Sequence, residues 1–181
     1  MPFQPHPEVW LLVVALLGLA SYAVRVIGPK VVRDGSRVVS RRQVGWFLGG
    51  VLVLWAASDW PIHDIAEERL YSVHMVQHLL LSYVAAPLFL LATPVWLARL
   101  IVGSSRITRF VAKPVFAGVF YNVVIVFTHW QNVVNGSVDN AAAHYGLHVL
   151  LFAASLLMWL PVCGPVPELR LSLPVQMVYL F

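Results

Sequence analysis

Residues 71–94, YSVHMVQHLLLSYVAAPLFLLATP, form an apolar stretch long enough to cross a lipid bilayer as one helix. His74 and His78 are four residues apart near its start, so an α-helix places both side chains on one face, one turn apart. Ionisable side chains are costly in hydrocarbon, and a pair of them on one face therefore indicates a functional site. A second pair with the same spacing, His144 and His148, begins a later apolar stretch.

The composition indicates a membrane protein. Of the 181 residues, 60% are hydrophobic and only 11% are charged, whereas a soluble domain carries roughly 25% charged residues. The formal net charge of +4 comes mainly from two short basic segments, so it predicts membrane orientation and no nucleic-acid partner. The single cysteine, Cys163, excludes an internal disulfide and a CxxC metal motif.

The pattern of apolar stretches predicts an all-α, polytopic helical bundle, one transmembrane domain over residues 1–181 with five full spans and the start of a sixth. The predicted spans cover residues 9–27, 44–57, 71–94, 115–134 and 141–162, with a partial span at 174–181. Because the last segment is too short to cross, we expect a chain that is truncated at its C-terminus. Pro87 is expected to bend the third span.

Charge asymmetry predicts the orientation. Placing the basic segments 30–43 and 99–113 in the cytoplasm puts the N-terminus outside. The acidic residues assigned to the outer side are Glu8, Asp59, Asp64, Glu67, Glu68 and Asp139. All seven histidines then lie on the outer side, with both pairs roughly 6–13 Å below the surface at ~1.5 Å per residue. We expect the two pairs, at matched depth, to form one site between helices.

The imidazoles of the four paired histidines suit copper, zinc and iron, so ligand type leaves the metal open. Met75 lies about 60° around the helix from His78 and offers a soft ligand. A zinc protease is disfavoured, because HMVQH has Val76 and Gln77 where HExxH needs its glutamate. Haem binding, a proton path and structural hydrogen bonds between helices remain alternatives to a metal site.

The other three histidines have less specific interpretations. His129, at the outer end of the fourth span, fits a metal ligand and a hydrogen bond to a neighbouring helix about equally well. His6 is expected in a solvated tail, and His63 in an interfacial loop. Thr128, His129 and Gln77 are the candidates for binding the second ring nitrogen of the metal ligands.

The segment HMVQHLLLSYVAAPLFLLATP resembles the third-span signature of the polytopic bacterial cytochrome c oxidase assembly factors called CtaG, which are distinct from the single-span copper chaperone of that name. The segments WPIHDIAEERLYSVHMVQH and THWQNVVNGSVDNAAAHYGLH agree, and the resemblance covers roughly residues 44–181. Family members continue through further spans, with a polar, glycine-containing segment that this sequence lacks.

The resemblance implies a non-catalytic factor of the bacterial plasma (inner) membrane that assists maturation of a haem–copper oxidase. By that resemblance, His74, His78, His144 and His148 carry over directly as the copper-handling residues, and His129 less directly. Partners would be cytochrome c oxidase subunits and the lipid bilayer, and a homo-oligomer is a further expectation.

We therefore predict that the outer histidine cluster holds a copper ion, as Cu(I), and delivers it to the oxidase. Neutral imidazoles, with Met75 nearby, hold Cu(I) without burying much uncompensated charge. The alternative is a membrane redox protein with bis-histidine haem. Four-helix cytochromes of that kind usually stack their haems at different depths, whereas these two pairs share one depth, which disfavours haem.

Overall fold

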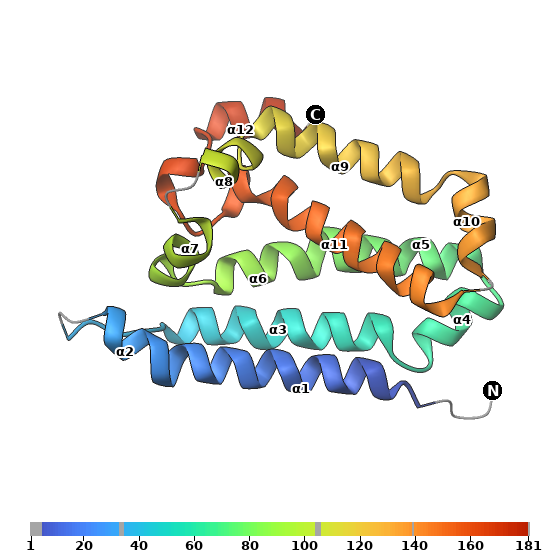
Figure 1. Cartoon of the computed structure of the whole chain (residues 1–181), viewed down its shortest axis with the longest axis horizontal. Coiled ribbons are helices and arrows are strands. Elements are labelled where there is room, and N and C mark those ends of the chain that lie inside the picture. The colour runs from blue at the N-terminus through green and yellow to red at the C-terminus, as the bar shows by residue number, and fades with distance from the viewer. Residues whose placement is uncertain (1–4, 33–34, 104–105, 139, 181) are drawn as a thin grey trace. The chain divides into compact units, whose positions relative to one another are not determined.

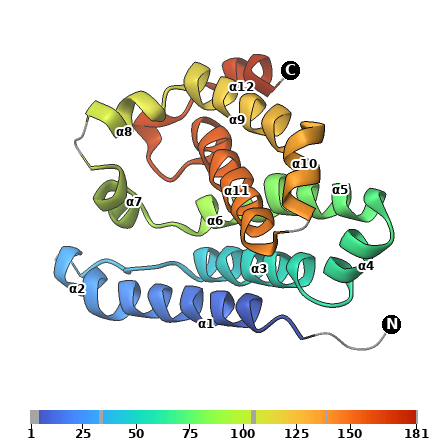
Figure 2. The same cartoon turned by 45° about the vertical axis from the view of Figure 1, so that its right-hand side comes forward.

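The structure is a computed structural model that describes residues 5–32, 35–103, 106–138 and 140–180. Within these ranges every regular element is helical, which confirms the all-α prediction. The chain divides into two compact units, residues 1–101 and 102–181. Figures 1 and 2 show the helices of each unit from two directions.

The described residues of the first unit form seven α-helices, and the last of them reaches the boundary of the unit. They are α1 (Pro7–Tyr22), α2 (Gly28–Val31), α3 (Arg41–Ser58), α4 (Ile62–Glu68), α5 (Tyr71–Leu79), α6 (Ala86–Ala92) and α7 (Val95–Val102). A π-helical segment, Ala23–Ile27, joins α1 to α2, and another, Leu80–Ala85, joins α5 to α6. Each comes shortly before a proline, Pro29 or Pro87. Proline lacks the N–H and its ring collides with the carbonyl four residues back, and a wider π turn accommodates both effects.

Packing in the first unit depends on small side chains. Helix α3 lies along α6 and the π-helical segment Leu80–Ala85, and α1 lies along α3 (Figures 1 and 2). Ala57 and Ala85 are 0% exposed. A Cβ added at Gly50 would lie 3.3 Å from a ring carbon of Phe89, so glycine permits this close approach. Small residues at helix contacts are typical of membrane bundles, where van der Waals packing drives association.

The second unit contains α8 (Arg106–Val111), α9 (Pro114–Thr128), α10 (Gln131–Val138), α11 (Ala141–Cys163), a 3₁₀ turn (Pro167–Leu169) and α12 (Leu173–Leu180). Helices α9 and α11 pack together along a core formed by Tyr121, Val124, Leu151, Ala154 and Met158. The spacing of three and four residues within each set places them on one face of their helix. The hydroxyl of Tyr179 donates to the carbonyl of Met158 at 2.9 Å and ties α12 to α11.

Three helical segments are long and apolar enough to cross a membrane, namely Pro7–Val31, Tyr71–Ala92 and Ala142–Cys163. They correspond to the first, third and fifth predicted spans. The predicted second span is part of α3, whose first turn is polar because it contains Arg41, Arg42 and Gln43. The predicted fourth span is a shorter apolar helix, Pro114–Thr128, because the chain turns at His129 into α10. The five-span prediction is thus supported for three segments.

Several residues used in the charge and length arguments fall outside the described ranges. These are Arg33, Asp34, Asp139 and Phe181. Helix α12 ends at Leu180 and coincides with the predicted partial span.

Candidate metal centre

The two histidine pairs occupy identical positions in their helices. His74 and His78 are the fourth and eighth residues of α5, and His144 and His148 are the fourth and eighth residues of α11. The ring centroids are 4.3 Å apart in the first pair and 4.6 Å apart in the second. The prediction that each pair shares one helix face is confirmed. That the two pairs bind one metal together stays a prediction.

In the α11 pair the two Nε2 atoms of His144 and His148 are 2.9 Å apart and form a hydrogen bond. One ring must donate its proton and the other must accept it with its lone pair. Two nitrogens on a tetrahedral metal lie about 3.3 Å apart, given bonds of ~2.0–2.1 Å. The pair can therefore chelate a metal after a small opening and the loss or transfer of the shared proton.

The start of α11 is fixed by a cap. The side-chain oxygen of Asn140 accepts a hydrogen bond from the backbone N–H of Ala143 at 3.1 Å. Such caps satisfy an N–H that the helix itself cannot pair. Because His144 follows directly, the cap also fixes the position of the first histidine.

The α5 pair is flanked by an aromatic ring. Tyr71 stacks on His74 with ring centroids 6.0 Å apart and an angle of 21° between the planes. Both histidines are half-buried, and so is Met75 on the same helix. The role of Met75 as a soft ligand stays a prediction.

Gln77, between the two histidines of α5, is only 2% exposed and connects this helix to α4. Its amide nitrogen donates to Nδ1 of His63 at 3.3 Å, so that Nδ1 is the accepting nitrogen of the ring. His63 is 5% exposed. The Oε1 atom of Gln77 is buried and makes no hydrogen bond to the residues that the structure describes. A buried oxygen of this kind is destabilising by ~1–3 kcal/mol, and it is a feature found at sites that another group completes.

His6 lies in the same network, at the end of the first unit that carries α4. Its Nε2 is 2.8 Å from Oδ1 of Asp64, and its Nδ1 is 3.1 Å from Oε1 of Glu8. Its ring meets that of His63 edge to face, with centroids 4.7 Å apart. Burial lowers the pKa of His6, but the hydrogen bonds and charges of Asp64 and Glu8 outweigh it, so the pKa is raised above its ordinary value of 6.5.

Two expectations from the sequence are therefore wrong. His6 is not a solvated tail residue, and His63 is a buried residue of α4 rather than part of a loop. The reason is that α4 carries a buried carboxylate, Asp64, and a buried carboxylate needs a donor. The segment before α1 supplies His6 to it. Nearby, the indole N–H of Trp10 donates to Asp59 at 2.9 Å.

His129 is held by its own helix. Its Nδ1 lies 2.9 Å from the carbonyl oxygen of Ile125, a contact in which the ring must donate. The hydroxyl of Thr128 is 3.2 Å from the same nitrogen. In a neutral ring this leaves the lone pair on Nε2, the arrangement that metal-binding histidines commonly have. Both a structural and a ligand role are compatible with this geometry.

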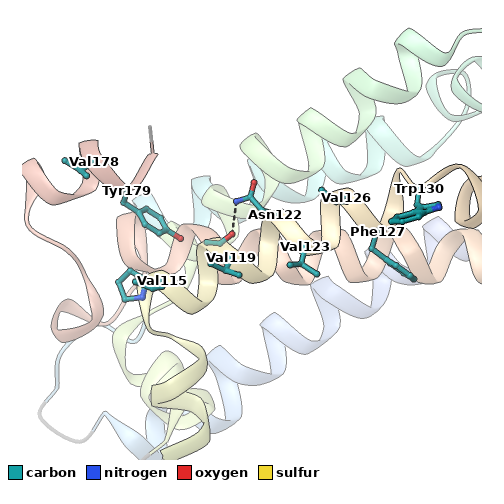
Figure 3. A pocket seen from close by; sticks show the side chains of 11 residues that line it. Val115, Val119, Asn122, Val123, Val126, Phe127, Trp130, Val178 and Tyr179 are labelled. Atoms are coloured by element: carbon teal, nitrogen blue, oxygen red, sulfur yellow. Dashed lines mark hydrogen bonds between the residues drawn. The ribbon is translucent and has the colours of Figure 1, made fainter.

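A groove of about 820 Å³ runs along α9 and α12 in the second unit (Figure 3). Residues of α9, four of them valines, form most of its wall, with Trp130 and Tyr179 also lining it. Asn122 lies among them, and its amide donates to the carbonyl of Gly118 at 2.8 Å (Figure 3). None of the paired histidines lines this groove, so it is separate from the candidate metal centre.

One comparison with known proteins identifies a family. The model of the cytochrome c oxidase caa3 assembly factor family matches residues 11–181. The match contains both histidine pairs and His129, and it extends further towards the N-terminus than the segments on which the resemblance rested. No curated protein and no solved structure matches the chain.

Proposed function

The chain belongs to the cytochrome c oxidase caa3 assembly factor family, and we propose that it works there by holding copper between its two histidine pairs and passing it to an oxidase subunit. On this proposal the protein crosses the bacterial plasma membrane several times, with its N-terminus and all histidines on the outer side. It is a carrier rather than a catalyst, and copper is its cargo.

The observation that carries the proposal is the repeated geometry of the two pairs. Each pair is the fourth and eighth residue of its helix, and the rings within each pair are 4.3 or 4.6 Å apart. An assembly that inserts both helices from one side brings the pairs to the same depth. Four imidazoles at one depth then offer a complete ligand set for one copper ion.

Transfer requires ligands that can be exchanged one at a time. Two chelating pairs on separate helices suit this, because one pair can release the ion to a client while the other still holds it. Binding to the α11 pair also displaces the proton shared by His144 and His148. That proton can return when copper leaves, so release restores the hydrogen bond between the rings.

The proposal is tested by removing one ligand from each pair with His78→Ala and His148→Ala together. The matched control is Leu79→Ala with Val149→Ala, which trims the exposed neighbouring side chain on each helix and leaves the imidazoles in place. The measurements are copper per purified oxidase, oxidase activity, and the amount of the assembly factor in the membrane. We expect low copper and low activity in the histidine variant alone, with normal amounts of the factor in both.

Normal copper loading in a strain whose only copy carries both histidine substitutions would overturn copper delivery. Loss of the variant protein itself, with the control retained, would instead indicate that the histidines tie helices together. Partial recovery in copper-supplemented medium would support delivery.

Bis-histidine haem remains the alternative from another class. Haem takes its two axial nitrogens from opposite faces of the macrocycle, and histidines four residues apart on one helix approach from the same face. A bis-histidine haem would therefore need one axial histidine from α5 and the other from α11. An optical spectrum of the purified protein separates the alternatives, because a Soret band would favour haem and copper without one would favour the carrier.

A further inference from the structure

Arg25 is an isolated charge near the end of the first long apolar segment, Pro7–Val31. No other charged residue lies between Glu8 and Lys30. Its side chain is exposed, and it makes no hydrogen bond or ion pair with any residue that the structure describes. A charge inside a membrane helix is costly without a partner, so its position indicates that it pairs with a group outside the described residues, and a bound ligand is one such group.

A cavity of about 420 Å³ lies beside Arg25, entirely within the first unit. Its walls come from α1, α3, α6 and α7 and are mainly apolar, with Phe47, Phe89 and Leu97 among them. Leu48 at its lining is 52% exposed, so the cavity is open to its surroundings.

The polar groups of the cavity are mostly donors. Arg25 presents a guanidinium, which only donates. The side-chain oxygen of Gln43 already accepts from the backbone N–H of Ser40 in the cap of α3, which leaves its NH₂ group as a donor. The hydroxyl of Thr93 is used, because it donates to the carbonyl of Phe89 at 2.7 Å. A ligand with anionic oxygens therefore fits the polar part of the cavity.

The surrounding sequence strengthens the positive field. Residues 25–42 carry six basic residues and one acid. Basic pockets between membrane helices, next to the cytoplasmic surface, are typical sites for anionic lipid headgroups. A free phosphate would leave the apolar walls unused, and a zwitterionic headgroup would bring its own cation next to Arg25.

We propose that this cavity binds an anionic phospholipid, with the headgroup phosphate on Arg25 and Gln43 and part of an acyl chain along Phe47, Phe89 and Leu97. The lipid fills the space between α1 and the helices α3, α6 and α7. No histidine lines this cavity, and the inference rests on the proposed membrane orientation but not on copper binding.

The test uses the whole chain in nanodiscs that contain equal amounts of phosphatidylglycerol and phosphatidylcholine with the same acyl chains. After extraction in mild detergent, the retained lipid is counted by native mass spectrometry. We expect one phosphatidylglycerol to be retained about fivefold in preference to phosphatidylcholine, the selectivity expected from one basic contact. Arg25→Gln should abolish the preference, and Arg25→Lys should keep most of it.

Arg109→Gln is the matched control, since it removes an exposed basic residue of α8 in the other unit and should leave the preference unchanged. A second variant tests the apolar part: Val44→Trp adds bulk at the exposed lining and should reduce retention of both lipids. Equal retention of the two lipids by the wild type, or an unchanged preference in Arg25→Gln, would overturn the proposal. So would full displacement of the lipid by soluble glycerol phosphate, which would reduce the site to a simple anion site.

Discussion

The histidine-bearing ends of α5 and α11 have the same spacing and very different surroundings. Both pairs hold the fourth and eighth positions of their helix, with similar ring separations. Next to the α5 pair, Gln77 joins a buried network that runs through His63 and His6 to Asp64. In the α11 pair the rings are hydrogen-bonded to each other.

Spacing along the helix therefore determines the geometry of a pair, whereas the packing around the pair determines what it can do. The α5 helix is connected through buried polar side chains to α4 and to the segment before α1, so we expect it to be the rigid side of the site. The α11 pair must give up a shared proton before it can bind a metal, so we expect it to be the side that changes during loading.

If the two pairs bind one metal, both must face the same side of the membrane, and labelling from one side tests this in an all-or-none way. In a Cys163→Ser background, Asn135→Cys and Ser36→Cys place single thiols at exposed positions on opposite sides of the predicted topology. We expect an impermeant thiol reagent to label Asn135→Cys in intact cells and Ser36→Cys only after lysis. The reverse pattern would invert the topology and place the histidines at the cytoplasmic face.

A second prediction asks whether the two pairs are one site or two. We expect one copper per chain, and we expect His74→Ala with His78→Ala to lose it as completely as His144→Ala with His148→Ala. Losing partners that only orient a ligand typically weakens metal binding by ~10–100-fold, so loss of two direct ligands should exceed this. Copper is measured by metal analysis after dialysis against a competing chelator. Two coppers in the wild type, falling to one in either variant, would show two independent sites.

Much of the fold could be predicted from sequence because it follows from local properties. Long apolar stretches gave the helices Pro7–Val31, Tyr71–Ala92 and Ala142–Cys163, and a spacing of four gave the geometry of both pairs. The length of the apolar helix before His129 does not follow from hydropathy, because the polar residues after Thr128 turn the chain into α10 and end the helix early. The polar residues themselves are the sequence signal for this turn, but a hydropathy average over the segment does not reveal it.

The network around His63 could not be predicted in the same way. His6 and Asp64 are 58 residues apart in the chain, and each alone reads as an ordinary exposed polar residue. Their contact depends on how α4 packs beside the segment before α1. Neither hydrophobic periodicity nor a sequence motif predicts that packing. One signal was present: Gln77 stands in an apolar helix between two histidines, and a buried amide requires polar partners.

A third prediction compares what holds the two helices in place. Gln77→Ala removes the amide that donates to Nδ1 of His63, and we expect it to lower the free energy of unfolding by about 1–3 kcal/mol. Asn140→Ala removes the cap of α11 and should lower it by ~1 kcal/mol. Unfolding is followed in mixed detergent micelles.

Because Gln77 contacts His63 rather than a paired histidine, copper affinity should change by less than about tenfold in Gln77→Ala. An Asn140→Ala effect larger than that of Gln77→Ala would contradict the assignment of α5 as the rigid side.

A fourth prediction is a weak pH dependence of stability that arises from the α5 side alone. The pKa of His6 is raised in the folded protein by Asp64 and Glu8, despite the opposing effect of burial. Below its unfolded pKa of 6.5 the ring is charged in both states, and its attraction to the two carboxylates stabilises the fold in full. As the pH rises through the folded pKa, the ring loses its charge and this stabilisation is lost.

We expect the free energy of unfolding to decline as the pH rises above 6.5, and Asp64→Asn to flatten that decline. Asn140→Ala, which changes only the α11 side, should shift the whole curve down and keep its slope. Because Glu8 still contacts His6 in Asp64→Asn, a smaller decline is expected to remain there; a decline of undiminished size would assign the pH dependence to a group other than His6.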